Sequence, residues 1–228
     1  INIGGNGIGN AGAASVCSAL GCNNVLVSLS LWDTGIGAAG AASVCSALER
    51  NSVLTSLNLS SNNIGAVGAA SVGSTLERNS VLTSLDLRNS KLFDAGAASV
   101  CSALECNSVL TSLNLSQNDL SAAGAASLCF ALERNSVLTS LDLSYNYFGA
   151  TGAAVICSAL RHNSALTSLD LSRNCHIGDA GAAGVCSVLE CNSVLTSLEL
   201  SCSGISDAAF VPIKALLKRN QTRPVRRL

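Results

Sequence analysis

The chain has 228 residues, of which 48% are hydrophobic, 3% aromatic and 12% charged, with 20 glycines and no methionine. Such a bias toward small and aliphatic residues is typical of a repeated unit rather than of an ordinary globular domain. The net charge is −1, but six of the 13 basic residues lie in the last fifteen positions and all 14 acidic residues precede them. This basic end has no interleaved aromatic residues, so we expect no nucleic acid as partner. No apolar run anywhere in the chain reaches the ~18 residues of a membrane helix, so we also expect no membrane as partner.

A unit of 28 residues repeats along the chain. Each copy opens with LTSLNL or a close variant, at Leu26, Leu54, Leu82, Leu110, Leu138, Leu166 and Leu195. The last interval is one residue longer, because of an insertion at Cys175 or His176. The first eight residues match the second half of a unit, which predicts that the chain starts inside a repeat and belongs to a longer chain or a larger assembly.

Each unit contains the patterns of a strand, a turn and a helix. Leu57 and Leu59 alternate with polar residues, as in a short strand with one buried face. A turn with Asn62 follows, and the apolar residues of segment 69–76 then recur at i, i+3 and i+7, which is one stripe of a helix. Stacked units share one core, and they bend because neighbouring strands lie ~4.8 Å apart whereas helices need roughly 8–10 Å.

The pattern LxxLxLxxNxIGxxGAxxxxxxLxxN, present as LTSLDLSYNYFGATGAAVICSALRHN and six relatives, resembles the leucine-rich repeats of ribonuclease inhibitor, NOD-like receptors and the Ran GTPase-activating protein. The resemblance implies an α/β fold, a right-handed βα solenoid shaped as a horseshoe, with a parallel sheet on the concave face and helices on the convex face. Asparagine at the turn, where ribonuclease inhibitor often has cysteine, is closer to the NOD-like and Ran-type forms.

The alignment of the copies also predicts two segments. Residues 1–206 form leucine-rich repeats, the first of them truncated, and residues 207–228 form a C-terminal capping helix and a basic tail. In this alignment Lys214 takes the slot of Cys186, and Pro212 is expected in the first helical turn, where a missing N–H costs little.

Eleven cysteines invite a disulfide or metal interpretation. Six of them fill one slot of the repeat helix, too far apart for disulfides, and are predicted to be buried and reduced: Cys17, Cys45, Cys101, Cys129, Cys157 and Cys186. So many free thiols favour a reducing compartment, and we expect a cytoplasmic protein without cofactor or bound metal. A minor metal or redox site at Cys175, His176 and Cys202 stays open.

The sequence lacks the elements of an active site. The two histidines, His162 and His176, lie at a helix end and in a turn, with no evident nucleophile or general-base partner. The GIGNAG and GIGAAG segments resemble a dinucleotide fingerprint, but the repeat itself accounts for their glycines. We therefore predict that the chain is not an enzyme.

The copies differ most just after each strand, whereas their helices barely differ. The only tryptophan and both tyrosines stand there, and Trp, Tyr and Arg are the side chains that most often anchor interfaces. Beside them, the outward strand position becomes acidic toward the C-terminal half. The predicted partner-binding residues are Trp32, Asp33, Asp86, Arg88, Lys91, Asp142, Tyr145, Tyr147, Asp170, Arg173 and Glu199.

These observations favour a ligand-sensing or scaffolding module that engages a protein partner, with a basic surface to meet the acids, through its concave face and adjacent loops. The resemblance leaves two alternatives open: a GTPase activator of the Ran type, or an enzyme inhibitor like ribonuclease inhibitor.

Overall fold

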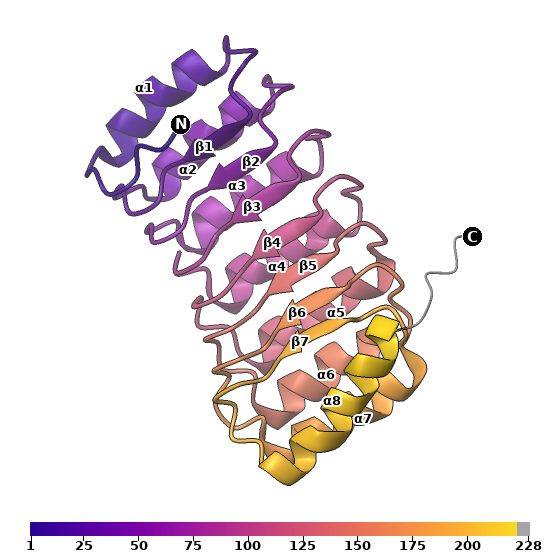
Figure 1. Cartoon of the computed structure of the whole chain (residues 1–228). Helices are drawn as coiled ribbons and strands as arrows, with labels where there is room; N and C mark the ends of the chain where they lie inside the picture. The colour runs from indigo at the N-terminus through magenta and orange to yellow at the C-terminus, as the bar shows by residue number, and fades with distance from the viewer. Residues whose placement is uncertain (223–228) are drawn as a thin grey trace.

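The computed structural model describes residues 1–222, and the segment 223–228, with Arg223, Arg226 and Arg227 of the predicted basic tail, lies outside them. In the described part, strands and helices alternate along the chain (Figure 1). The strands are β1 (Ser28–Ser30), β2 (Ser56–Asn58), β3 (Ser84–Asp86), β4 (Ser112–Asn114), β5 (Ser140–Asp142), β6 (Ser168–Asp170) and β7 (Ser197–Glu199). The helices are α1 (Gly9–Leu20), α2 (Ala38–Leu48), α3 (Gly65–Leu76), α4 (Phe93–Leu104), α5 (Ala122–Arg134), α6 (Gly149–Leu160), α7 (Gly178–Cys191) and α8 (Asp207–Thr222).

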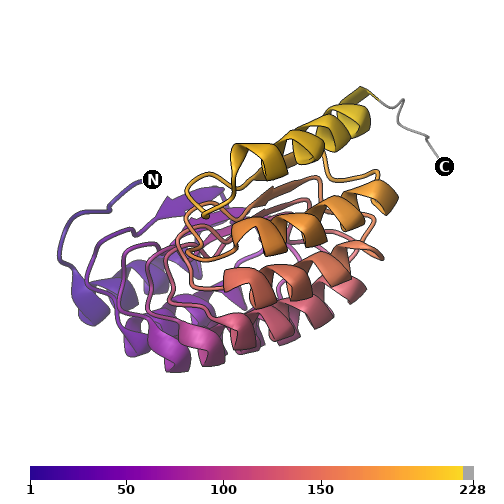
Figure 2. The ribbon, with the colours of Figure 1, turned by 90° about the horizontal axis from the view of Figure 1, so that it is seen from below.

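The strands form one parallel sheet in the order β1 to β7, and each pairs with the next without a shift in register. Leu57 therefore lies beside Leu85, and every slot of the repeat forms a straight column across the sheet. The helices lie in a row on the outer side of the bent stack (Figure 2). The predicted α/β solenoid, with strands inside the arc and helices outside, is confirmed.

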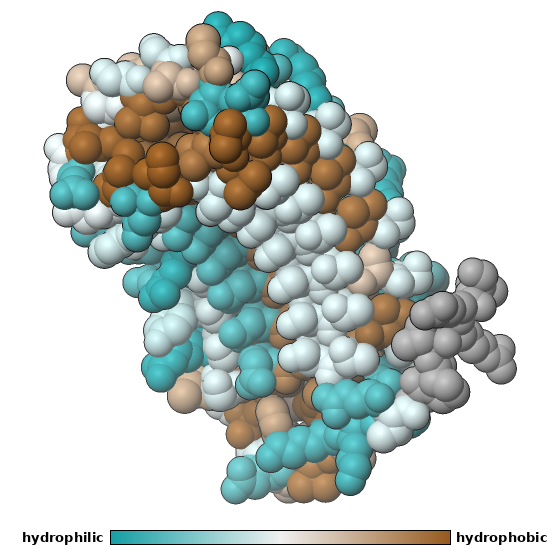
Figure 3. Space-filling model, turned by 45° about the horizontal axis from the view of Figure 1, so that its top comes forward, coloured by the Kyte–Doolittle hydropathy of each residue, from teal (hydrophilic) through white to brown (hydrophobic). Residues whose placement is uncertain are grey.

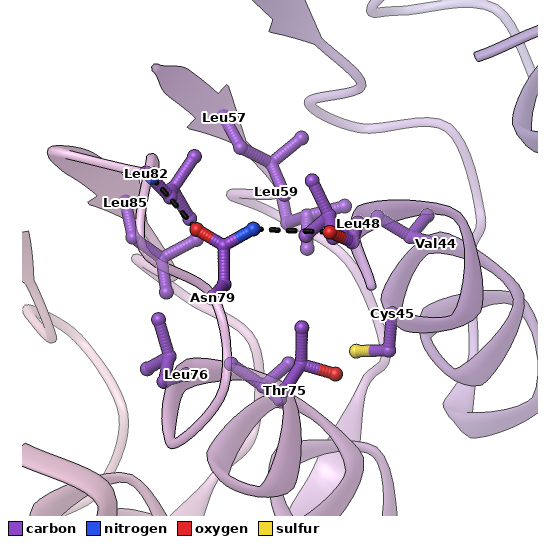
Figure 4. A pocket seen from close by; sticks show the side chains of 11 residues that line it. Val44, Cys45, Leu48, Leu57, Leu59, Thr75, Leu76, Asn79, Leu82 and Leu85 are labelled. Atoms are coloured by element: carbon purple, nitrogen blue, oxygen red, sulfur yellow. Dashed lines mark hydrogen bonds between the residues drawn. The ribbon is translucent and has the colours of Figure 1, made fainter. Parts of the chain in front are cut away.

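The core lies between the sheet and the helices. Leu57 and Leu59 of the strand pattern are 2% and 1% exposed, and the helix stripe of Ala69, Val72 and Leu76 is buried against them. In Figure 4 the leucines of two repeats face the side chains of α2 and α3 across a space of about 10 Å³. A space of that size holds about one water molecule, so the interior is filled by side chains.

Buried asparagines tie four of the turns to the repeat before them. Asn62 Nδ2 donates to the carbonyl of Leu59 in its own turn and to that of Leu31 in the preceding repeat, at 3.0 and 2.7 Å. Its Oδ1 accepts the N–H of Ile36 at 2.9 Å. We call the asparagines of this slot the turn column: Asn62, Asn118, Asn146 and Asn174. Each of these asparagines therefore bonds both its own turn and the preceding repeat.

A second asparagine column follows the helices. Asn79 Nδ2 donates to the carbonyl of Leu48 at 3.0 Å, and its Oδ1 accepts the N–H of Leu82 at 2.7 Å (Figure 4). We call this set the exit column: Asn51, Asn79, Asn107, Asn135, Asn163, Asn192 and Asn220. Both columns satisfy backbone groups that a helix or strand end leaves unpaired, and they do so across the repeat interface.

Helix α8 closes the C-terminal edge of the stack. Its residues Ile213 and Leu217 are buried, and Asn220 Nδ2 donates to the carbonyls of Asn192 and Leu195 at 3.0 and 2.8 Å. The expected position of Pro212 in the first turn is wrong. The helix begins at Asp207, five residues earlier, so Pro212 lies inside it and leaves one backbone carbonyl without its helical N–H partner.

Four of the six helix-slot cysteines are buried as predicted: Cys17, Cys45, Cys101 and Cys157. Cys129 and Cys186 are only half-buried, so the prediction is wrong for these two. Cys129 Sγ lies 3.6 Å from the Ser158 hydroxyl and 3.8 Å from the Glu133 carboxylate, at the surface of the helix row. Cys186 lies in α7, and the equivalent slot of the last helix, α8, holds the exposed Lys214.

The N-terminal edge differs from the C-terminal one. Hydrophobic atoms gather at the N-terminal end of the stack, whereas pale and hydrophilic atoms cover the face of the sheet (Figure 3). Ile1, Val25 and Val27 are 70%, 77% and 55% exposed there. In a later repeat the slots of Ile1 and Val25 are covered, since Leu57 is buried and Val53 half-buried, whereas at this edge they are open.

Candidate functional site

The sheet face carries a column of polar side chains at the last position of strands β2 to β7. Asn58, Asp86, Asn114, Asp142, Asp170 and Glu199 follow one another through the parallel register. We call its acidic members the acidic column: Asp86, Asp142, Asp170 and Glu199. The three aspartates are half-buried and Glu199 is exposed.

The aspartates also hold the turn that follows each strand. One carboxylate oxygen accepts the backbone N–H two residues later, from Asp86 to Arg88 at 2.9 Å and from Asp142 to Ser144 at 2.9 Å. Asn58 and Asn114 make the same bond, so aspartate is not required for it. Burial raises the pKa of the Asp86 carboxyl and Asp142 adds to this rise, while Arg88 opposes it. One carboxylate oxygen of each aspartate therefore stabilises the turn through a hydrogen bond to the backbone.

Beyond the strand, each unit bends through a left-handed residue. The backbone angle φ is positive in this slot at Asp33, Ser61, Asn89, Gln117, Tyr145, Arg173 and Cys202. Asparagine and glycine adopt this conformation readily, whereas Gln, Tyr and Arg do so at a cost of about 1 kcal/mol. The slot nevertheless holds long side chains in three consecutive repeats, at Gln117, Tyr145 and Arg173.

These long side chains contact one another across the repeats. The Arg173 guanidinium lies over the Tyr145 ring, 4.9 Å from its centroid. Arg88 Nε and Nη2 both donate to Gln117 Oε1 at 3.3 Å. The sequence prediction omitted Gln117, although it occupies a variable slot. We call the long side chains of this slot and of the residue before it the loop ridge: Trp32, Arg88, Gln117, Tyr145 and Arg173.

Trp32 lies apart from the rest of the loop ridge. The second repeat, between Trp32 and Arg88, has only serines in these slots, Ser60 and Ser61. The indole packs closely against the first turn: a Cβ added to Gly4 would be 2.1 Å from Trp32 Cδ1. The tryptophan is 40% exposed, so it packs the N-terminal edge as well as presenting a surface.

Three more predicted residues are exposed beside the ridge. Asp33 follows Trp32, and Lys91 and Tyr147 lie later in their turns. Tyr147 is 61% exposed, whereas its neighbour Phe148, which stands in a variable part of the turn, is only 2% exposed and fills the core slot held by Ile64 in another copy. An aromatic residue in these turns is therefore not always at the surface.

The remaining candidate sites are less well formed. Cys175, His176 and Cys202 are all exposed, and residues 1–222 contain no group of three or more His, Cys, Asp or Glu side chains placed to hold a metal ion. A hollow of about 370 Å³ lies between α2 and α3 on the convex side, with walls of alanine and serine and Cys45 and Thr75 at its floor. Burial raises the pKa of Cys45 to about 11, which makes this thiol a poor nucleophile. In the described part of the chain, no helix combines the length and apolarity needed to cross a membrane.

Comparison with solved structures identifies the same fold in other proteins. A structure of "Leiomodin-1 Actin-Binding Site 2" superposes with a TM-score of 0.61 at 22% identity, over 68% of this chain and 88% of that one. The tropomodulin C-terminal domain of Caenorhabditis elegans superposes with a TM-score of 0.59 at 16% identity, over 68% of this chain and 93% of that one. A search of curated protein sequences found no match.

The repeats also match a known family profile, described as "Leucine Rich repeat". Six copies match, at residues 50–73, 78–101, 106–129, 134–157, 162–186 and 191–210. The matches span more than half of the chain and coincide with the stacked units of the structure. The chain belongs to the leucine-rich repeat family.

Proposed function

We infer that this chain is a protein-binding module without catalytic activity of its own, and that its partner docks on the loop ridge and the adjacent sheet face. One observation carries the inference. Gln117, Tyr145 and Arg173 stand in a slot whose left-handed backbone favours asparagine or glycine. These long side chains are exposed, and their backbone conformation destabilises the fold. Binding of a partner explains why they occupy this slot.

The scaffold supports this inference. Leucine-rich repeats present one long surface on which many side chains meet a partner together. The leiomodin-1 structure that shares the fold is named as an actin-binding site, which illustrates that such a scaffold can hold a macromolecule. The identity is too low to transfer that partner to this chain.

The acidic column extends the proposed surface onto the sheet. Its carboxylates lie in one register line beside the loop ridge, with Asp142 and Asp170 in neighbouring strands. Like charges at strand spacing repel one another, and basic groups of a partner would relieve that repulsion. The partner therefore presents Lys or Arg side chains toward Asp86, Asp142, Asp170 and Glu199.

The finer assignments are part of the same proposal. Each unit carries a full helix within a period of 28 residues, which supports the ribonuclease-inhibitor type of repeat. Segment 207–228 comprises a capping helix and a basic tail, and the burial of Ile213 and Leu217 in α8 at the end of the stack supports the cap. The many free thiols support a cytoplasmic location. A GTP hydrolysis assay with candidate small GTPases separates this binding module from an activator of the Ran type.

Affinity capture from the source cell tests the proposal. The bait is the 228-residue chain, compared with Arg88→Ala/Tyr145→Ala/Arg173→Ala on the ridge and with a matched convex variant, Arg50→Ala/Glu77→Ala/Arg78→Ala. Hot-spot losses of at least ~1–2 kcal/mol each predict that the ridge variant loses the partner and the convex variant keeps it. Capture that persists in the ridge variant and fails in the convex variant would place the interface on the other face.

A further inference from the structure

Two arginines of the loop ridge start three repeats apart and lean toward each other. Arg88 reaches forward to Gln117, to which it donates twice at 3.3 Å. Arg173 reaches back over Tyr145, with 4.9 Å between its guanidinium carbon and the ring centroid. Gln117 and Tyr145 occupy the same slot of consecutive repeats, and the backbone ladder continues there, since Gln117 N–H donates to Ser144 at 3.0 Å. The two slots are therefore about 4.8 Å apart, the spacing of neighbouring strands.

Both guanidinium groups keep hydrogen-bond donors free. A guanidinium has five N–H donors, and Arg88 uses two of them in hydrogen bonds to Gln117. Within residues 1–222 neither arginine forms an ion pair, whereas Arg78 pairs with Glu49 and Arg134 with Glu105 on the convex side. Asp86 is near enough for Arg88 to lower the pKa of its carboxyl, yet its Oδ1 is bonded to backbone.

The contacts also hold these arginines in place. A free arginine side chain loses up to ~2 kcal/mol of conformational entropy when it is fixed. The contacts with Gln117 and Tyr145 already restrict the two arginine side chains before a ligand binds. Less conformational entropy is therefore lost on binding, and the two guanidinium groups are preorganised. Both supports stand in left-handed backbone, at φ of 57° and 56°, where the fold itself would favour asparagine or glycine.

We propose that Arg88 and Arg173 form a site for an oxyanion carried by the protein partner, a phosphorylated side chain or a carboxylate. The remaining Nη donors of Arg88 and the guanidinium fork of Arg173 match the oxygens of such a group, and a phosphate, with a charge of about −1.5 to −2, engages both guanidinium groups at once. This inference rests on the proposed function, because it names the chemistry that the partner brings to the ridge. The partner thus presents an oxyanion to the ridge and basic groups to the acidic column.

Arginine side-chain NMR tests this site without any partner protein. The 228-residue chain, labelled with ¹⁵N-arginine, is titrated with the capped peptides Gly-phosphoserine-Gly, Gly-Glu-Gly and Gly-Ser-Gly. The Nε–H signals of Arg88 and Arg173 are expected to shift together and saturate with phosphoserine, more weakly with glutamate, and not with serine. Arg78 and Arg134, already paired with glutamates, are internal controls. Equal, unsaturated shifts at all arginines, or none at Arg88 and Arg173, would overturn the proposal. Saturation by glutamate as tight as by phosphoserine would identify the ligand as a carboxylate and support the shared chemistry.

Variants of the supporting residues separate a prepared site from two independent surface charges. Gln117→Ala and Tyr145→Leu leave both arginines in the chain but remove their supports, and should weaken phosphoserine binding about three- to tenfold. Tyr145→Phe keeps the aromatic face and should bind as the wild type does. Equal affinity of Tyr145→Leu and Tyr145→Phe would refute the preorganised site. If the titration fails while the ridge variant still loses its partner in affinity capture, the oxyanion site is wrong and the protein-binding function stands.

Discussion

Two columns of side chains run side by side along this solenoid, one residue apart in the sequence, and they follow opposite rules. The turn column, with Asn146, is buried and bonds the backbone of two repeats. The slot before it, with Tyr145, is exposed and changes from repeat to repeat. In the turn slot every copy keeps a short polar side chain, Asn in four copies and Ser or Thr in the other three, because the side chain bonds the backbone. In the slot before it the backbone favours asparagine or glycine, yet some copies carry Gln, Tyr or Arg, which indicates that something other than folding selects the residue.

The largest expected effect is in the turn column. Asn146→Ala leaves the N–H groups of Asn118 and Leu120 and the carbonyl of Leu115 without their buried partner. Unsatisfied buried groups cost ~1–3 kcal/mol each, partly relieved by relaxation, so we expect a loss of about 2–4 kcal/mol in the free energy of unfolding, measured by urea denaturation. Asn146→Ser, which imitates Ser90 in the same slot, should lose less. A loss below ~0.5 kcal/mol for the alanine variant would mean that water replaces the column.

The buried thiols predict a pH dependence. Burial raises the pKa of Cys101 and of Cys157 to about 12, and that of Cys17 and of Cys45 to about 11. The unfolded chain releases these protons near pH 9 while the folded chain keeps them, so the stability contribution is intact below pH ~9 and is lost as the pH rises toward the folded values. The free energy of unfolding should fall by on the order of 1 kcal/mol per pH unit for each thiol above pH ~9.

Urea denaturation at pH 8, 9 and 10 measures this slope. Cys101→Ala is the matched variant, since it removes one buried thiol and leaves the exposed Cys106 in place. Its slope above pH 9 should be less steep than that of the wild type. Identical slopes, or labelling of native Cys101 by a thiol reagent as fast as in urea, would contradict its burial.

Trp32 is predicted to be intermediate between the two columns. Trp32→Ala should lower the free energy of unfolding by about 1 kcal/mol, more than an ordinary surface substitution, because the indole covers the backbone of Gly4. Arg88→Ala, on an exposed side chain of the same slot, is the control and should change stability by less than ~0.5 kcal/mol. Equal effects of the two substitutions would mean that the packing on Gly4 contributes nothing.

The repeat made most of this fold predictable. The alternation of Leu57 and Leu59, the helix stripe and the recurring asparagines each appear several times, so the strand, turn and helix of every unit follow from one pattern. The sequence alignment failed where one copy departs from the template locally. It predicted Pro212 in the first turn of the last helix, which in fact begins five residues before it, at Asp207. It also predicted that Cys129 and Cys186 are buried, although their exposure depends on their neighbours in the next helix.

The candidate surface was less predictable than the fold. Variation among the copies indicated where exposed residues lie, and Trp32, Arg88, Tyr145 and Arg173 were among the predicted partner-binding residues, but it did not distinguish their contacts. Only coordinates show that Trp32 lies on Gly4, that Arg173 turns back over Tyr145, and that Gln117 holds Arg88. These contacts depend on side-chain directions across repeats, which no periodicity encodes.

We propose that the side chains of the loop ridge are selected for binding a partner rather than for folding. The substitution Tyr145→Asn tests this proposal most directly. Asparagine relieves the left-handed strain at φ 56° but removes the ring beneath Arg173, and these two effects of about 1 kcal/mol nearly cancel. Urea denaturation and partner affinity are measured on the same preparation, with the captured protein as ligand. We expect a free energy of unfolding within ~0.5 kcal/mol of the wild type and an affinity for the partner at least ~10-fold weaker. A destabilised variant that binds its partner as tightly as the wild type would contradict it.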